Sequence, residues 1–259
     1  MPEPTSYRPG ALCWTELHAP EPEAAERFYT AVLGWGYVPT GPEFDHYRYA
    51  TSRRQMVAGI APTQEAEGSW IVSFATEDVD ALAERVKAAG GELDHGPADL
   101  GVLGRSALVV DPSGAHVGFW QPRAHIGAGL FSEPSALCWA ELAVRETGPA
   151  DRFYAEVLGL RVEAYEAAGE AGYAAFRLAD GEAVAGRTVL AGGEEEEEEA
   201  EPFWMPYFGV TDAKRTARSA VDSGASVLYA GVNAEERGVA VVADPWGAVF
   251  AVLEVASPG

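Results

Sequence analysis

Carboxylate, imidazole and aromatic side chains alternate along two short stretches of the sequence. Trp14, Glu16 and His18 are spaced two residues apart, as are His116, Gly118 and Trp120. In an extended strand such residues share one face. A carboxylate beside aromatic rings can attract a cationic ligand, or act as a general base with a raised pKa. We therefore take Glu16 and His116 as candidate catalytic residues.

Further aromatic residues are candidates for the walls of a pocket. Tyr47 and Tyr49, or else His46 and Arg48, would contribute from a hairpin whose inward face the sequence does not settle. Aromatic walls with a few polar groups suit a flat organic ligand. Core positions are the alternative for the tryptophans. The predicted ligand-binding residues are Trp14, Glu16, Tyr47, Tyr49, Trp120, Trp139, Glu141 and Tyr207.

An internal repeat organises the chain. Leu-Cys-Trp-Thr-Glu-Leu at 12–17 recurs as Leu-Cys-Trp-Ala-Glu-Leu at 137–142, and an Asp-Pro-x-Gly-Ala turn occurs near the end of each copy. Two long copies indicate sibling domains rather than a solenoid. We predict a first domain over 1–123, a linker over 124–134 and a second domain over 135–259. The glutamate-rich stretch 192–201 is predicted to be a solvated loop inserted into the second copy.

The elements that must position these residues follow from periodicity. A strand is expected over 12–18, followed by a helix that begins at Pro22 and ends before Gly34. The other expected elements are a hairpin (45–51 and 55–61), helices (79–89, 149–158 and 212–223) and strands (69–76, 105–110, 115–120, 203–210, 238–243 and 248–255). Cys13 and Cys138 are expected to be buried packing residues on the strand face opposite the tryptophans.

This order of elements, with Phe28-Tyr29 near the end of the first helix, resembles the glyoxalase/bleomycin-resistance/dioxygenase (vicinal oxygen chelate) superfamily. The linker pattern at 125–128 before a second Leu-Cys-Trp is similar to the two-domain actinobacterial branch that is often labelled hydroxylase. The resemblance implies an α+β fold of tandem βαβββ modules. Four βαβββ units would form two half-open mixed sheets, each enclosing a cleft.

Metal-using members of that superfamily bind their ion through His, Gln or Glu on the sheet. The matching positions here are Trp14, Ile71 and Gly118 in the first module, and Trp139, Met205 and Ala251 in the second. None of these side chains is a useful ligand for a divalent metal. We therefore predict no metal and no cofactor. A displaced site made of Glu16, His18 and His116 is the alternative; the second module lacks its counterpart.

Charge and composition restrict the partners. The 259 residues carry a net charge of −22, which disfavours nucleic acid and is compatible with a cationic ligand. No apolar run reaches membrane-spanning length, no secretory signal pattern is present, and the two cysteines are far apart. We expect a cytoplasmic protein that does not bind membranes. Because the two halves of one chain can pair with each other, we expect a monomer that is an internal pseudo-dimer. A homodimer is the alternative.

Three functions are consistent with these observations. The leading prediction is a metal-free protein of the glyoxalase/bleomycin-resistance type that sequesters or handles a small aromatic natural product in antibiotic biosynthesis or resistance. The alternative is a metal-independent enzyme with hydroxylase-like or isomerase-like acid–base chemistry from Glu16 or His116. The second alternative is a metal-dependent glyoxalase or dioxygenase that uses the displaced site.

Overall fold

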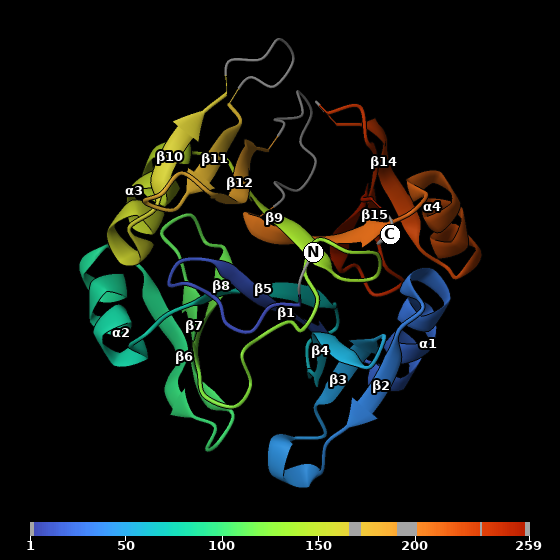
Figure 1. Ribbon diagram of the computed structural model, residues 1–259, viewed down its shortest axis with the longest axis horizontal. Coiled ribbons are helices and arrows are strands. Elements are labelled where there is room, and N and C mark those ends of the chain that lie inside the picture. Colours follow the sequence, from blue (N-terminus) through green and yellow to red (C-terminus); the bar gives the residue numbers. More distant parts are fainter. Residues whose placement is uncertain (1–2, 166–171, 191–200, 234, 257–259) are drawn as a thin grey trace.

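Two open, mixed sheets of eight strands each make up the molecule (Figure 1). The structure is a computed structural model that describes residues 3–165, 172–190, 201–233 and 235–256. The predicted acidic insertion at 192–201 lies outside the described residues except for Glu201. Among the described residues, no helix has the length and apolar character needed to cross a membrane.

Each half of the chain builds one sheet. The first contains β1 (Leu12–Ala19), β2 (Gly36–Pro39), β3 (Arg48–Ser52), β4 (Gln55–Pro62), β5 (Ser69–Ala75), β6 (Glu92–Asp99), β7 (Gly104–Val110) and β8 (His116–Pro122). The second contains β9 (Leu137–Val144), β10 (Arg161–Ala164), β11 (Ala174–Arg177), β12 (Ala183–Val189), β13 (Phe203–Val210), β14 (Ser226–Val232), β15 (Gly238–Ala243) and β16 (Val249–Glu254).

The strand order is the same in both sheets. It is β2-β3-β4-β1-β5-β8-β7-β6 in the first module and β10-β11-β12-β9-β13-β16-β15-β14 in the second. With the helices α1 (Pro22–Leu33), α2 (Val79–Ala88), α3 (Thr147–Leu158) and α4 (Ala213–Asp222), this gives four βαβββ units. A short 3-10 helix η1 (Pro42–Phe44) follows β2. The predicted fold class is confirmed.

The ends and faces of the helices explain why they form. Pro22 begins α1, and Gly34 ends it in a left-handed conformation with φ 72°. The buried side of α1 includes Phe28 and Tyr29. The Asp78 carboxylate accepts a hydrogen bond from the Ala81 backbone N–H at 2.9 Å and so caps α2.

The core lies between the two sheets and is shared by both modules. One continuous cluster of buried side chains includes Trp35 and Phe74 from the first half and Trp204 and Phe250 from the second. Helix α1 packs beside α4, and α2 packs beside α3, on opposite sides of the molecule (Figure 1). Because neither half buries its apolar face alone, the two halves fold against each other.

Reciprocal hydrogen bonds join the halves inside this core. The Tyr29 hydroxyl of α1 donates to Asp244 Oδ2 at 2.9 Å, and the Tyr154 hydroxyl of α3 donates to Asp111 Oδ2 at 2.7 Å. Each aspartate begins the Asp-Pro-x-Gly turn that precedes the last strand of its module. A helix of one half therefore holds the turn of the other.

A buried indole completes each pair. Trp70 Nε1 donates to the Tyr29 hydroxyl at 3.1 Å, and Trp204 Nε1 donates to the Tyr154 hydroxyl at 2.7 Å. Burial, reinforced by the neighbouring aspartate, raises the pKa of both tyrosines, so that each keeps the proton that it donates. These buried polar groups are thus satisfied by one another.

Both cysteines are buried, as predicted, but the strand face of Cys13 differs from the prediction. Cys13 is buried in the same cluster as Trp14 and Trp120, which is separate from the core between the sheets. The register of β1 against β5 shifts between Leu12 and Trp14, which is a bulge at Cys13. A bulge interrupts the alternation of faces, so the rule that assigned opposite faces fails at this point.

Candidate functional site

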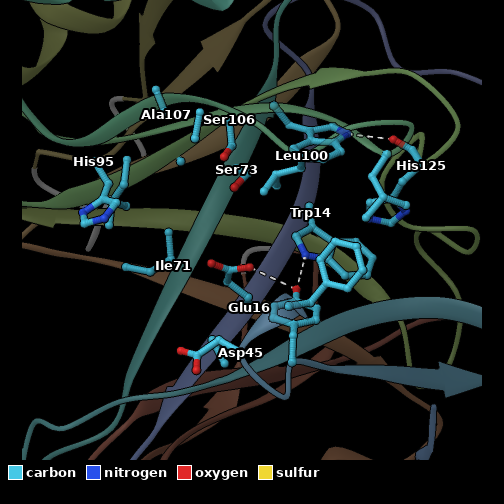
Figure 2. A pocket seen from close by; sticks show the side chains of 18 of the residues that line it. Trp14, Glu16, Asp45, Ile71, Ser73, His95, Leu100, Ser106, Ala107 and His125 are labelled. Atoms are coloured by element: carbon cyan, nitrogen blue, oxygen red, sulfur yellow. Dashed lines mark hydrogen bonds between the residues drawn. The ribbon is translucent and has the colours of Figure 1, made fainter. Parts of the chain in front are cut away.

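A cavity of ≈ 570 Å³ opens on the first sheet, on the face away from the shared core (Figure 2). Pockets for small organic molecules commonly have volumes of about 300–1,000 Å³. Strands β1 and β3 to β8 line the cavity, together with the loop around η1, the loop between β6 and β7, and the segment that follows β8.

The structure brings most of the predicted first-module residues to this cavity. Its lining includes Trp14, Glu16, Tyr47, Tyr49 and Trp120. Alternation along β1 and β8 accounts for three of them. The sequence did not settle which face of the hairpin points inward. In the structure, Tyr47 and Tyr49 face the cavity.

The neighbouring arginine of the hairpin points the other way. Arg48 Nε lies 2.7 Å from Glu26 Oε1 of α1, and its guanidinium also pairs with Glu23. This ion pair on the helical side fixes which face of β3 turns toward the cavity.

Glu16 is the anchored carboxylate of the cavity. Its Oε2 accepts a hydrogen bond from the Tyr47 hydroxyl at 3.0 Å, and that hydroxyl accepts one from Trp14 Nε1 at 3.1 Å (Figure 2). Burial, and then the charge of Glu16, raises the pKa of Tyr47 well above its ordinary value. Tyr47 therefore remains a hydrogen-bond donor, and the carboxylate is held in one orientation.

The other oxygen of the carboxylate lies beside an imidazole. His18 Nε2 is 3.3 Å from Glu16 Oε1. Burial lowers the pKa of His18, but the hydrogen bond to Glu16 and the charges of Glu16 and Asp94 outweigh it, so the pKa is raised overall. The Glu16 side chain is 30% exposed, so this oxygen is accessible from the cavity.

Two glycines make room for this arrangement. Gly59 lies opposite Glu16 on β4, and a Cβ there would be 1.7 Å from the Tyr47 hydroxyl oxygen. Gly118 of β8 lies beside Ser73 of β5, and a Cβ there would be 2.1 Å from Ser73 Oγ. Side chains at these positions would displace the groups that shape the cavity.

His116 does not line the cavity. It lies at the first position of β8, its side chain is 50% exposed, and its Nε2 is 3.7 Å from Asp94 Oδ2. The alternation along β8 holds for Gly118 and Trp120, but the strand begins at the rim of the sheet. The structure therefore does not bring His116 together with Glu16 as a catalytic pair.

His125 is a cavity residue that sequence reasoning missed. Its ring packs edge-on against Trp14, Trp120 and Tyr49, with centroid distances of 4.7, 5.4 and 5.5 Å (Figure 2). Burial lowers the pKa of His125 to about 4, against an opposing effect of Glu16. The only signal in the sequence was its place in the linker pattern, which identifies no contact.

The residues of this cavity do not fit a divalent metal. Trp14 lies opposite Ser73, and Ser73 lies opposite Gly118, so no imidazole or carboxylate stands on that row of the sheet. In the described part of the chain, no group of three or more His, Cys, Asp or Glu side chains could hold a metal ion. Glu16, His18 and His116 are therefore not assembled as the displaced set, and His116 lies beside Asp94 outside the cavity.

The matching face of the second module is packed differently. Glu141 accepts hydrogen bonds from the Tyr207 hydroxyl at 2.6 Å and from the Tyr173 hydroxyl at 3.2 Å. Trp139 packs against a buried cluster that includes Met205 and Tyr207. The remaining buried members are Cys138, Val239, Ala251 and Leu253. Of the three predicted residues of this module, Tyr207 therefore contacts both Glu141 and Trp139.

Fold, repeat and sequence together identify the class. The chain belongs to the glyoxalase/bleomycin resistance protein/dioxygenase superfamily, whose family description matches residues 12–119, and residues 139–253 match a glyoxalase-like domain. Two kinds of curated relative span almost the whole chain. "Putative glyoxylase CFP32" of Mycobacterium tuberculosis is 36% identical over 99% of both chains. "Anthracycline biosynthesis protein DauV" of Streptomyces sp. (strain C5) is 33% identical over 97% of this chain and 95% of the relative.

Solved structures share the fold at low identity. The Mn(II)-bound glyoxalase from Novosphingobium aromaticivorans superposes with a TM-score of 0.66 at 16% identity, covering 95% of this chain and 82% of the other. The 2,3-dioxygenase LapB from Pseudomonas sp. KL28 superposes with a TM-score of 0.65 at 12% identity, covering 98% and 96%. These similarities concern the fold alone.

Proposed function

We propose that the first module binds a small planar aromatic molecule without a metal ion, and that the protein sequesters or handles this molecule. The observation that carries the proposal is the cavity itself, in which a continuous aromatic wall meets one anchored carboxylate. Trp14 and Tyr49 stand 6.3 Å apart, and Tyr47 and Tyr49 stand 5.2 Å apart, so their rings form one surface. Such a wall offers stacking area at a modest entropic cost.

The charge of the lining favours a ligand with a positive group. Glu16, Glu43 and Asp45 line the cavity, and the described lining contains no lysine or arginine. A cation near aromatic faces and a partly desolvated carboxylate gains both cation–π and ionic attraction. The name of the Streptomyces relative, an anthracycline biosynthesis protein, supports a polycyclic aromatic natural product as the ligand class.

The proposal is tested by titrating the full chain with polycyclic aromatic amines, an anthracycline among them. Trp14 and Trp120 lie in the cavity, so quenching of tryptophan fluorescence reports occupancy, and calorimetry gives the stoichiometry. We expect saturable binding of one ligand per chain, with a Kd on the order of micromolar. Absence of binding to the whole panel would contradict the proposal.

A second candidate function rests on the pair formed by Glu16 and His18. A carboxylate 3.3 Å from an imidazole in an aromatic cavity could remove and return a proton on a bound ligand, as a metal-independent isomerase or hydroxylase-like enzyme would require. Under this reading, Glu16→Gln abolishes turnover and leaves the binding of a neutral aromatic ligand intact. Retained turnover would remove Glu16 from that role.

A further inference from the structure

We propose that His125 contacts the ligand and selects aromatic molecules that carry a ring hydroxyl or carbonyl group, so that the segment joining the two modules forms part of the binding site. The inference rests on the proposed function, because it concerns the same cavity. It adds a neutral hydrogen-bonding position to the charged position at Glu16.

The segment that carries His125 is fixed in place. The Ala128 N–H donates to the Cys13 carbonyl at 2.8 Å, and the His125 N–H donates to the Leu103 carbonyl at 3.1 Å. Gly127 has φ 112°, and a Cβ there would lie 2.4 Å from the Cys13 carbonyl oxygen. The backbone of this segment therefore approaches β1 as closely as only glycine allows.

The ring of His125 is held as firmly as its backbone. Trp120 Nε1 donates to the His125 carbonyl at 2.8 Å, and the imidazole contacts three aromatic rings of the cavity wall edge-on (Figure 2). A side chain packed in this way keeps one orientation before any ligand arrives. A contact from such a pre-organised group loses little conformational entropy.

The nitrogens of the ring have no hydrogen-bond partner among the described residues, while the ring lines the cavity. Because its pKa is lowered to about 4, the imidazole is neutral near pH 7, with one nitrogen as donor and the other as acceptor. The ring nitrogens are not among the fully buried unpaired atoms of the described residues, so a molecule in the cavity can reach them. A ligand hydroxyl or carbonyl supplies the missing partner, whereas an ammonium group is better matched by Glu16.

The test measures the affinity of each of two ligands for each of three protein variants. The ligands are an aminoalkylanthracene and its ring-hydroxylated analogue, which differ only in one phenolic hydroxyl. The full chain carries histidine, phenylalanine or asparagine at position 125. We expect the wild-type protein to bind the hydroxylated ligand about tenfold more tightly, which is the magnitude of one well-made hydrogen bond. His125→Phe keeps the aromatic packing and should abolish this preference while still binding the ligand that lacks the hydroxyl.

Controls separate the inference from the proposed function. His125→Asn retains polar atoms on a shorter side chain and should restore part of the preference. His116→Phe, outside the cavity, should leave the preference unchanged.

A preference that survives in His125→Phe, or equal binding of both ligands by the wild-type protein, would overturn the inference and leave the proposed function standing. Failure of the wild-type protein to bind either ligand would overturn both. Unchanged affinity for the ligand without the hydroxyl verifies that the variant is folded.

Discussion

The two modules share strand order, helices and core, yet they treat the same carboxylate position differently. In the first module, Glu16 accepts a hydrogen bond from Tyr47 and has its other oxygen beside His18, at the edge of an open cavity. In the second, both oxygens of Glu141 accept hydrogen bonds from tyrosine hydroxyls. A carboxylate that is satisfied inside the protein has little to offer a ligand.

One position accounts for much of this difference. Ser73 lies opposite Trp14 in the first module, and Tyr207 lies opposite Trp139 in the second. The neighbours on the next strand are Gly118 and Ala251. Small residues leave space on the first sheet, while larger ones occupy the corresponding space on the second. If the first cleft binds a ligand as proposed, the second is less suited to do so, because larger side chains occupy the corresponding positions.

The substitution Ser73→Tyr should have the largest effect, because it gives the first module the side chain that the second module has at the matching position. A phenol at this position would occupy the cavity and donate to Glu16, as Tyr207 does to Glu141. We expect ligand affinity to fall by about 100-fold or more, because the ligand and the ring compete for one volume. Calorimetric titration measures the change, and Tyr207→Ser is the matched control in the other cleft. Undiminished binding in Ser73→Tyr would show that the ligand site lies elsewhere.

The two modules should respond alike to changes in the shared core, because each contributes the same tyrosine–aspartate hydrogen bond. Tyr29→Phe leaves Asp244 without its buried donor, and Tyr154→Phe does the same to Asp111. Each should lower the free energy of unfolding by about 1–3 kcal/mol, the usual penalty for an unsatisfied buried group. Chemical denaturation of the two variants measures the loss. A large loss for one and none for the other would contradict the symmetry of the core.

Charge recognition should distinguish the clefts again. Glu16→Gln preserves the shape of the side chain and its position beside Tyr47 but removes the negative charge. We expect affinity for a cationic aromatic ligand to fall about tenfold, and affinity for a neutral analogue to change little. Glu141→Gln should change neither. Equal effects of the two variants, measured by the same fluorescence titration, would mean that both clefts bind.

The smallest effect expected is a dependence on pH. The pKa of His18 is raised in the folded protein, so protonation of His18 favours folding; this contribution is fully present below the ordinary value of about 6.5 and is lost as pH rises through the raised value. Protonated His18 also competes with a cationic ligand for Glu16. Affinity should therefore decrease about two- to threefold as pH falls through that range. His18→Gln should flatten the profile; an unchanged profile would exclude His18.

Sequence reasoning succeeded where local patterns determine the outcome. The repeat and the alternation along β1 placed Trp14 and Glu16 on one face, and hydrophobic periodicity located the four helices. The edge strands β2, β6, β10 and β14 were missed, because edge strands bury little and need no regular alternation. The interior strands β11 and β12 of the second module were also given no range. The order of the main elements was therefore easier to predict than the strands that bury few side chains.

The candidate site was harder, because its decisive contacts join residues distant in sequence. The inward face of the hairpin depends on the ion pair between Arg48 and α1. The position of His125 depends on backbone hydrogen bonds between the segment after β8 and β1. His116 followed the alternation rule but lies where its strand begins, beside Asp94. None of these contacts has a signature in a single sequence.

Fusion of the two halves into one chain has a consequence for how such a protein can change over time. In an assembly of identical subunits, a mutation that fills one cleft fills every cleft, so activity and packing cannot be improved separately. Here a serine remains at position 73 while a tyrosine stands at 207, although both halves still hold each other's turns through Tyr29 and Tyr154. Covalent linkage removes this constraint of symmetry, so one copy can change its cleft while both copies keep the shared core.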